Sequence, residues 1–336
     1  MKAITTFTLA FASFGIASGA GAQQLTFAHG FNSNHYWYTQ IVDPWMTCVQ
    51  EKSDREVTFD HYPSGQIVGH NDALDAINNG LSSISPIAIG YETDKMPLNG
   101  LTMLPAMGET SVQMATAYRK MLTDRTALYD EFIQQGVHPL IVSLLPVYQL
   151  QSTGKPVESL DALSGAVIRS AGGALTLTID ALGAASAEIS IPDLYIAMQN
   201  GTVDGALSAH SSIKPFSLEE QLKSISTNGE FGSFATVLVM DNDTYGGLSD
   251  SARKVINDCS AQIEIDMAKY LDADNAALEE EFAGMGITMY EFPEDMLTEM
   301  AKRIAPVTAQ YVERLNQRGL PATATYEAYL EALGKS

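Results

Sequence analysis

One arginine stands where its guanidinium could hold a carboxylate. Arg169 ends the apolar stretch "LSGAVIR" and is followed by Ser170-Ala171-Gly172-Gly173, a flexible turn into a helix. In open α/β sheets the carboxyl ends of the strands face the crevice in which ligands bind. A guanidinium there offers planar, bidentate hydrogen bonding to a carboxylate. By spacing alone, an ordinary structural salt bridge is the competing interpretation.

Catalytic and metal-binding signatures are absent from the sequence. It contains no G-x-S-x-G elbow, H-E-x-x-H helix, Walker A loop or G-x-G-x-x-G turn. The six histidines lack the spacings that metal sites favour. Asp272-Ala273-Asp274-Asn275 resembles a calcium loop only faintly, because it lacks the turn glycine and lies in a helical pattern. Among 40 acidic residues, runs such as Glu219-Glu220 and Glu279-Glu280-Glu281 are typical of solvated surface. We expect no metal, no cofactor and no enzymatic activity.

The charge of the chain restricts its partners. With 19 basic and 40 acidic residues, the formal net charge is −21, and no Lys/Arg cluster occurs. This argues against nucleic acid or an anionic membrane surface as a partner, since binding phosphates requires a clustered basic surface. An anionic ligand gains no long-range steering from such a chain, so any anion site must be local.

Alternating strands and helices must position these residues. Hydrophobic patterns predict strands at 25–29, 56–62 and 84–89, with helices over 38–49 and 71–80 between them. The same rhythm returns with strands at 139–145, 166–170, 187–191 and 203–207, and with helices at 174–182 and from Pro192 to Gly201. Such alternation predicts parallel sheets with helices on their faces. A helix over 251–284 would be about 50 Å long, so we expect it to brace two domains.

The first 22 residues read as a secretory signal. One charge at Lys2, an apolar core and an A-x-A site at Ala20-Gly21-Ala22 fit a signal peptide better than a membrane anchor, which needs about 20 apolar residues. The remaining chain is longer than one domain of about 100–200 residues. Cys48 and Cys259 lie in predicted helices, and in an oxidising compartment they could form a disulfide or be two buried thiols.

The middle of the chain resembles a known family. "PVESLDALSGAVIRSAGG" and "ALGAASAEISIPDLYIAMQNGTVDGALS" look like the substrate-binding subunits of tripartite ATP-independent periplasmic (TRAP) transporters, the DctP-type family. "YPSGQIVGHNDALDAINNG", the signal peptide and the long helix also fit. The resemblance implies an α/β fold, a two-domain periplasmic-binding-protein clamshell with a long helix bracing both domains. We assign 1–22 to the signal peptide, 23–146 plus about 233–275 to domain I, and 147–232 plus about 276–336 to domain II.

The resemblance also implies a ligand site. Arg169 matches the strand arginine that holds the ligand carboxylate, although Val167 replaces the usual lysine before it. Gln149 and Ser208 fall where the acid-sugar binders of the family have arginine and asparagine, which puts an acid-sugar ligand in doubt. The remaining predicted contacts are His210 and, from domain I, Phe31, His35, Trp37 and Tyr91. An aromatic-lined pocket of this kind would suit a compact monocarboxylate or an aromatic acid, while each domain I residue could equally be core packing.

The predicted function is capture of a small organic carboxylate in the periplasm and delivery to TRAP membrane subunits, by a monomer. Because an enclosed arginine without a partner is costly, the closed state should be favoured only when a carboxylate pairs with it. One alternative is a secreted α/β enzyme, a hydrolase or lyase, that uses the interdomain cleft. Another is a binding module that serves a sensor or an ATP-driven importer.

Overall fold

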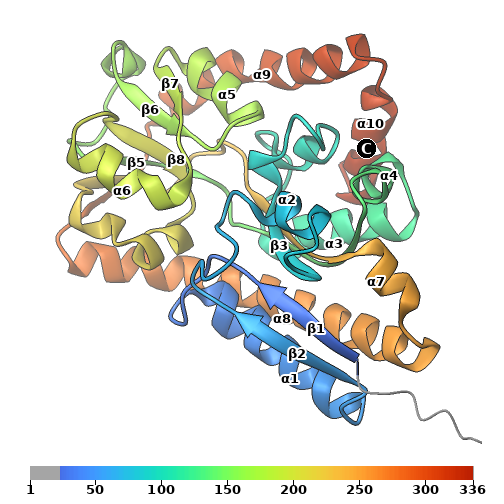
Figure 1. The fold of residues 1–336 in the computed structure, drawn as a ribbon. Helices are drawn as coiled ribbons and strands as arrows, with labels where there is room; N and C mark the ends of the chain where they lie inside the picture. Colours follow the sequence, from blue (N-terminus) through green and yellow to red (C-terminus); the bar gives the residue numbers. More distant parts are fainter. Residues whose placement is uncertain (1–22, 336) are drawn as a thin grey trace, which may run out of the picture.

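Two β-sheets divide the chain into two lobes (Figure 1). The structure is a computed structural model that describes residues 23–335, so the predicted signal peptide at 1–22 lies outside the described residues. The first sheet has the order β2 Val57–Tyr62, β1 Gln23–Ala28, β3 Ile84–Ala88, β10 Ala235–Asp241 and β4 Val137–Leu144. The second has the order β11 Thr288–Tyr290, β9 Ser224–Ser226, β5 Gln149–Ser152, β8 Gly205–Ser208, β6 Val167–Ser170 and β7 Ala185–Glu188.

Both sheets are mixed, which corrects the expectation of purely parallel sheets. Strand β10 runs antiparallel to both β3 and β4, and β5 runs antiparallel to β8 and β9. The other pairs, β1 with β2 and β3, β6 with β7 and β8, and β9 with β11, are parallel. The chain reaches β10 only after building most of the second lobe, so no βαβ crossover dictates the direction of this strand.

Ten α-helices surround the sheets in the described part of the chain. They are α1 Asp43–Lys52, α2 Ala73–Asn78, α3 Ser111–Thr123, α4 Ala127–Gln134, α5 Ala174–Leu182, α6 Ile191–Gln199, α7 Asn242–Gly247, α8 Asp250–Gly284, α9 Glu294–Gln317 and α10 Ala322–Ala332. A π-helical segment, Tyr38–Val42, leads into α1, and short 3-10 turns include Ile89–Tyr91, His210–Ser212 and Lys214–Phe216. The predicted α/β class is confirmed.

Most predicted elements lie within a few residues of their observed bounds. The strand expected at 187–191 is displaced, because β7 pairs with β6 over Ala185–Glu188 and Ile191 already begins α6. Ser190 is extended and precedes Pro192, whose ring fixes a helical φ in the first turn. The turn between strand and helix therefore falls earlier than the hydrophobic pattern indicates.

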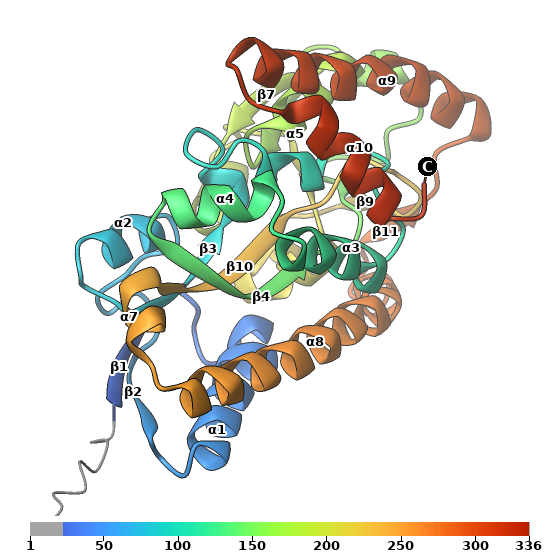
Figure 2. The same cartoon turned by 90° about the vertical axis from the view of Figure 1, so that its right-hand side faces the viewer.

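Helix α8 joins the lobes, as the sequence predicts. Its buried residues Ile256, Met267 and Leu271 belong to the main core, whereas Leu278 and Phe282 belong to a separate cluster beneath α6. Figure 2 shows α8 running along the molecule beside α1. One rigid element of 35 residues thus contributes to the packing of both lobes.

The C-terminal helices also span the molecule. Helix α9 packs on α5 beside the second sheet, and α10 returns to pack on α3 beside the first (Figure 2). The last helix therefore packs against domain I as well as against α9, although the proposed bounds place it in domain II. The domain bounds given above remain a proposal, and each of the two sheets falls wholly within one proposed domain.

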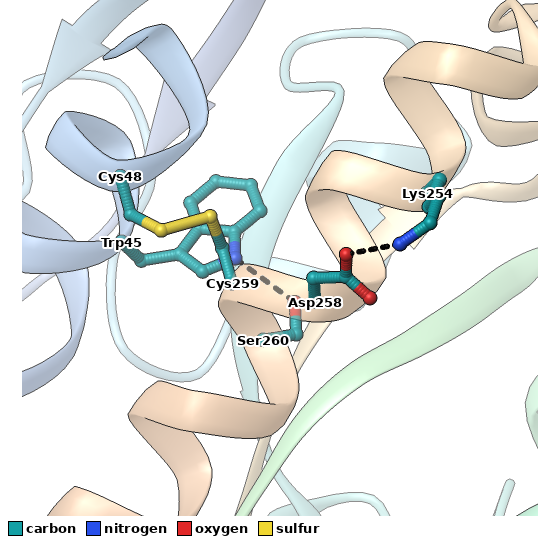
Figure 3. Close-up of a disulfide and its surroundings, with 6 residues drawn as sticks. All are labelled: Trp45, Cys48, Lys254, Asp258, Cys259 and Ser260. Carbon is teal, nitrogen blue, oxygen red and sulfur yellow. Dashed lines mark hydrogen bonds and ion pairs between the residues drawn. A yellow bond between two sulfur atoms is a disulfide. The ribbon is translucent and has the colours of Figure 1, made fainter. Parts of the chain in front are cut away.

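A disulfide fastens α1 to α8. Cys48 and Cys259 are bonded, with their Cα atoms 6.0 Å apart, and Figure 3 shows the bond between the two helices. Next to it, the indole Nε1–H of Trp45 donates to Ser260 Oγ at 2.9 Å. Two helices that are distant in sequence are thus held together within the first lobe. In residues 23–335 we find no helix with the length and apolarity needed to cross a membrane.

Candidate ligand-binding site

A cavity lies where the two lobes meet. The space between its walls is about 460 Å³, and this volume includes the part that opens to solvent. Its walls are formed by Phe31, His35, Tyr36, Trp37, His70, Ala88, Tyr91, Leu145, Tyr148, Arg169, Ile191, Ser212, Phe216, Phe234 and Thr236. The residues come from both lobes, so the cavity exists only while the lobes are together.

Arg169 is the single permanently charged residue among those walls. Strand β6, which lies between β8 and β7 in the second sheet, carries it near its C-terminal end, and only 1% of its surface is exposed. Its Nε–H donates to the Ile189 carbonyl oxygen at 2.6 Å and its Nη2–H to the Tyr91 hydroxyl at 3.1 Å. Within residues 23–335, no carboxylate lies within 4.0 Å of its nitrogens. The alternative of a structural salt bridge is thereby excluded for the described residues.

Two tyrosines flank the guanidinium. The Tyr91 hydroxyl accepts hydrogen bonds from Arg169 and, at 2.9 Å, from the backbone N–H of Ile191. Burial raises the pKa of Tyr148, and the nearby positive charge of Arg169 opposes this rise. The Tyr148 phenol is therefore neutral at physiological pH and can serve as a hydrogen-bond donor to an anion.

Aromatic rings make up much of the rest of the cavity wall. Phe31 stacks on Trp37 at 5.4 Å between ring centroids and lies 4.4 Å from the ring of His35. From the second lobe, Phe216 lies edge-on to His35 at 5.6 Å. The Phe31–His70 pair adds a T-shaped contact at 4.6 Å. A flat apolar or aromatic ligand body would meet ring faces and edges from both lobes.

The two histidines in the wall are uncharged. Burial lowers the pKa of His35 to about 3, with further lowering by His70 and His29, and burial lowers the pKa of His70 to about 4. At neutral pH each ring offers one N–H donor and one acceptor nitrogen. The cavity therefore combines one cation with neutral, mostly aromatic walls, and no aspartate, glutamate or lysine from residues 23–335 lines it.

The structure brings together five of the eight ligand contacts predicted from the sequence: Arg169, Tyr91, Phe31, His35 and Trp37. The other three do not line the cavity. The side-chain amide of Gln149 donates to the Gly229 carbonyl oxygen and accepts hydrogen bonds from the Gly229 N–H and from Ser226 Oγ. In the β5–β8 register, Gln149 pairs with Ser208.

Ser208 and His210 are buried inside the second lobe. Neither Ser208 Oγ nor either ring nitrogen of His210 has a hydrogen-bond partner in the described residues. The nearest carboxylate to His210 is that of Glu279, with Nδ1 and Oε1 3.7 Å apart. The family resemblance predicted Gln149 and Ser208 as ligand contacts, and His210 was predicted with them, but none of the three is among the residues that line the cavity.

Sequence reasoning missed the rest of the wall. His70, Phe216 and Ser212 lie in turns that no periodic pattern marks, and Phe234 and Thr236 start a strand whose place beside β3 depends on the mixed sheet order. The further unpredicted residues are Tyr36, Ala88, Leu145, Tyr148 and Ile191. A usable signal existed only for Tyr36, which lies between the predicted His35 and Trp37.

Comparison with known proteins places this geometry in a family. The family model of bacterial extracellular solute-binding protein, family 7 (DctP), matches residues 27–315. The chain belongs to this family. Its fold is likewise that of solved family 7 receptors of the TRAP type, as the resemblance implied.

Three relatives illustrate the match. A solute-binding protein of Albidiferax ferrireducens is 23% identical over 71% of each chain. A TRAP solute-binding protein from Rhodoferax ferrireducens, solved with copurified benzoate, has a TM-score of 0.86 at 22% identity, with 93% of this chain and 98% of that chain covered. A marine metagenome TRAP solute-binding protein, solved with 3-hydroxybenzoate, also has a TM-score of 0.86, at 20% identity over 94% and 99% of the chains. Because the solved structures are 22% and 20% identical to this chain, their likeness establishes its fold alone.

Proposed function

We propose that this family 7 protein captures a compact monocarboxylate with an aromatic or apolar body. The observation that carries the proposal is Arg169, a buried guanidinium with no carboxylate partner in the described residues, placed in the wall of an aromatic cavity. Burying an unpaired cation is costly, and a ligand carboxylate removes that cost by pairing with it. The benzoate and 3-hydroxybenzoate bound by two proteins of the same fold support this ligand class.

The number of charges in the cavity favours one carboxylate rather than two. Among the described residues, Arg169 is the only Lys or Arg side chain in the wall, and the imidazoles of His35 and His70 are neutral at physiological pH. A second carboxylate would be desolvated against neutral aromatic groups without a partner. A dicarboxylate of similar size should therefore bind more weakly than the matching monocarboxylate.

Binding and closure are coupled in this proposal. Arg169 belongs to the second lobe, while Phe31, His35 and Tyr91 belong to the first, so a ligand that pairs with the guanidinium also fills space between the lobes. The ligand shifts the population toward the closed form by its higher affinity for that form. The protein performs no chemistry on the ligand and delivers it to TRAP membrane subunits, in the periplasm, after removal of residues 1–22 and as a monomer. Neighbouring genes for such membrane subunits would support the delivery step.

A thermal-shift screen tests the ligand class. The chain from Gln23 onward is mixed with benzoate, 3-hydroxybenzoate, mandelate and aliphatic acids, each next to its amide. A free ligand concentration of 100 times the Kd stabilises the folded state by about 2.7 kcal/mol. This stabilisation raises the Tm by several degrees. We expect a shift with a monocarboxylate and none with its amide. Equal shifts with acid and amide, or a shift only with cationic solutes, would refute the proposal.

A further inference from the structure

Tyr91 lies at the contact between the two lobes, on the inner face of the cavity. It ends the turn Ile89–Tyr91 that follows β3 of the first lobe, and its ring packs against Phe234 at 5.3 Å between centroids. Its hydroxyl accepts one hydrogen bond from Arg169 Nη2 and one from the backbone N–H of Ile191, and both donors belong to the second lobe. Opening the lobes must break both bonds.

The turns on either side of this contact approach closely. A Cβ atom built on Gly172 of the second lobe would lie 3.1 Å from the carbonyl oxygen of Gly90, the residue before Tyr91. Gly172 also has a φ of +97°, which side-chain-bearing residues rarely adopt. The two glycines allow the first-lobe turn to reach the end of β6, and this brings the Tyr91 hydroxyl to the guanidinium.

The Tyr91 hydroxyl can still donate one hydrogen bond. A phenolic oxygen accepts through its lone pairs and donates through one proton. Two donors already occupy the accepting side of Tyr91, and in the described residues we find no acceptor for its proton. The free O–H thus lies beside the guanidinium nitrogen at which a bound carboxylate would be held.

We propose that the Tyr91 hydroxyl is a latch, which holds the lobes closed through Arg169 and Ile191 and donates its proton to the bound carboxylate. This inference rests on the proposed function for its second half. Tyr91 positions the guanidinium in the closed form, so the affinity for the acid and the closing equilibrium depend on the same oxygen. In the open form Arg169 Nη2 and the Ile191 N–H no longer donate to the Tyr91 hydroxyl and donate to water instead.

The Tyr91→Phe variant removes the hydroxyl and keeps the ring against Phe234. Tyr38→Phe is the matched control, because Tyr38 lies in the same lobe outside the cavity wall. Spin labels on cysteines introduced at Leu81 and Ile196, which are 57% and 54% exposed in different lobes, report opening by pulsed electron resonance. The native cysteines are bonded to each other and do not take the label.

At an acid concentration that saturates both proteins, we expect Tyr91→Phe to populate longer interlobe distances than the wild type, because the acid favours the closed form in which Tyr91 bonds to Arg169 and Ile191. Its Kd for the best acid of the screen should rise roughly 10- to 100-fold, since a hydrogen bond to a charged group is lost. Tyr38→Phe should change neither quantity, and circular dichroism verifies that both variants are folded. The latch is refuted if either the distance distribution or the Kd of Tyr91→Phe matches the wild type. A wild type that binds no acid refutes the proposed function and the donor role, whereas a wild type that binds the acid next to a Tyr91→Phe variant that behaves identically refutes the latch alone.

Discussion

Replacing Arg169 by methionine should separate a ligand-binding role from a structural one. Methionine fills similar space without charge or hydrogen-bond donors, and the site is 1% exposed, so water cannot replace the lost interactions. In the described residues the guanidinium donates to the Ile189 carbonyl and the Tyr91 hydroxyl and pairs with no carboxylate. Its removal therefore breaks no ion pair of the ligand-free protein.

The effect on binding should be large. Removing one partner of a buried, hydrogen-bonded charge pair costs about 2–5 kcal/mol of binding free energy, which raises Kd roughly 30- to 5,000-fold. The effect on stability should be small, because two hydrogen bonds of about 1 kcal/mol each are lost while the cost of burying an unpaired cation is relieved. We expect the free energy of unfolding of the ligand-free variant to lie within about 1 kcal/mol of the wild type.

Isothermal titration with the best acid of the screen measures the first effect, and urea unfolding without ligand measures the second. Arg303→Met is a useful control, because Arg303 makes a surface pair with Glu299 far from the cavity wall. It should leave Kd unchanged. If Arg169→Met binds the acid as the wild type does, the reasoning on the carboxylate is wrong. A loss of several kcal/mol in unfolding free energy together with unchanged Kd would identify Arg169 as a structural residue.

Three further changes probe stability. Reducing the Cys48–Cys259 disulfide, which closes a loop with a sequence separation of 211, should lower the unfolding free energy by about 2–5 kcal/mol, as measured by urea unfolding with and without reductant. Burial lowers the pKa of His210 to about 4, so between pH 6.5 and pH 4 the unfolded chain binds a proton that the folded chain does not. Stability should then fall on acidification, by up to about 1.4 kcal/mol per pH unit more in the wild type than in His210→Gln, as followed by urea unfolding at several pH values. Buried Glu264 accepts hydrogen bonds from Arg119 and from a backbone N–H, so Glu264→Gln should cost about 1–3 kcal/mol in the same assay, and an unchanged midpoint would contradict that role.

The elements that could be predicted from the sequence are those whose signals are local. Helix α8 has a long uninterrupted periodic pattern, and the rule that ligands meet strand ends applied directly to Arg169 near the end of β6. The length of the chain and of the helix at 251–284 predicted two domains braced by one helix, and the family resemblance added the clamshell arrangement.

The order of strands and the rest of the cavity wall depend on contacts between distant segments. Strand β10 lies between β3 and β4 because the chain returns from the second lobe, and no local pattern encodes that return. Phe216 and His70 lie in turns and meet only when the lobes close. Gln149 was assigned to the ligand site by position, but its amide is satisfied by the backbone of Gly229, which only the folded second lobe places there.

A crystal structure of the protein with its best-binding acid tests the central claim most directly. The account predicts a single ligand between the lobes, with its carboxylate within hydrogen-bond distance of the Arg169 guanidinium and of the Tyr91 hydroxyl. The ligand body should lie against Phe31, His35 and Phe216. A carboxylate bound away from Arg169, or an acid bound outside this cavity while the guanidinium stays unpaired, would contradict it.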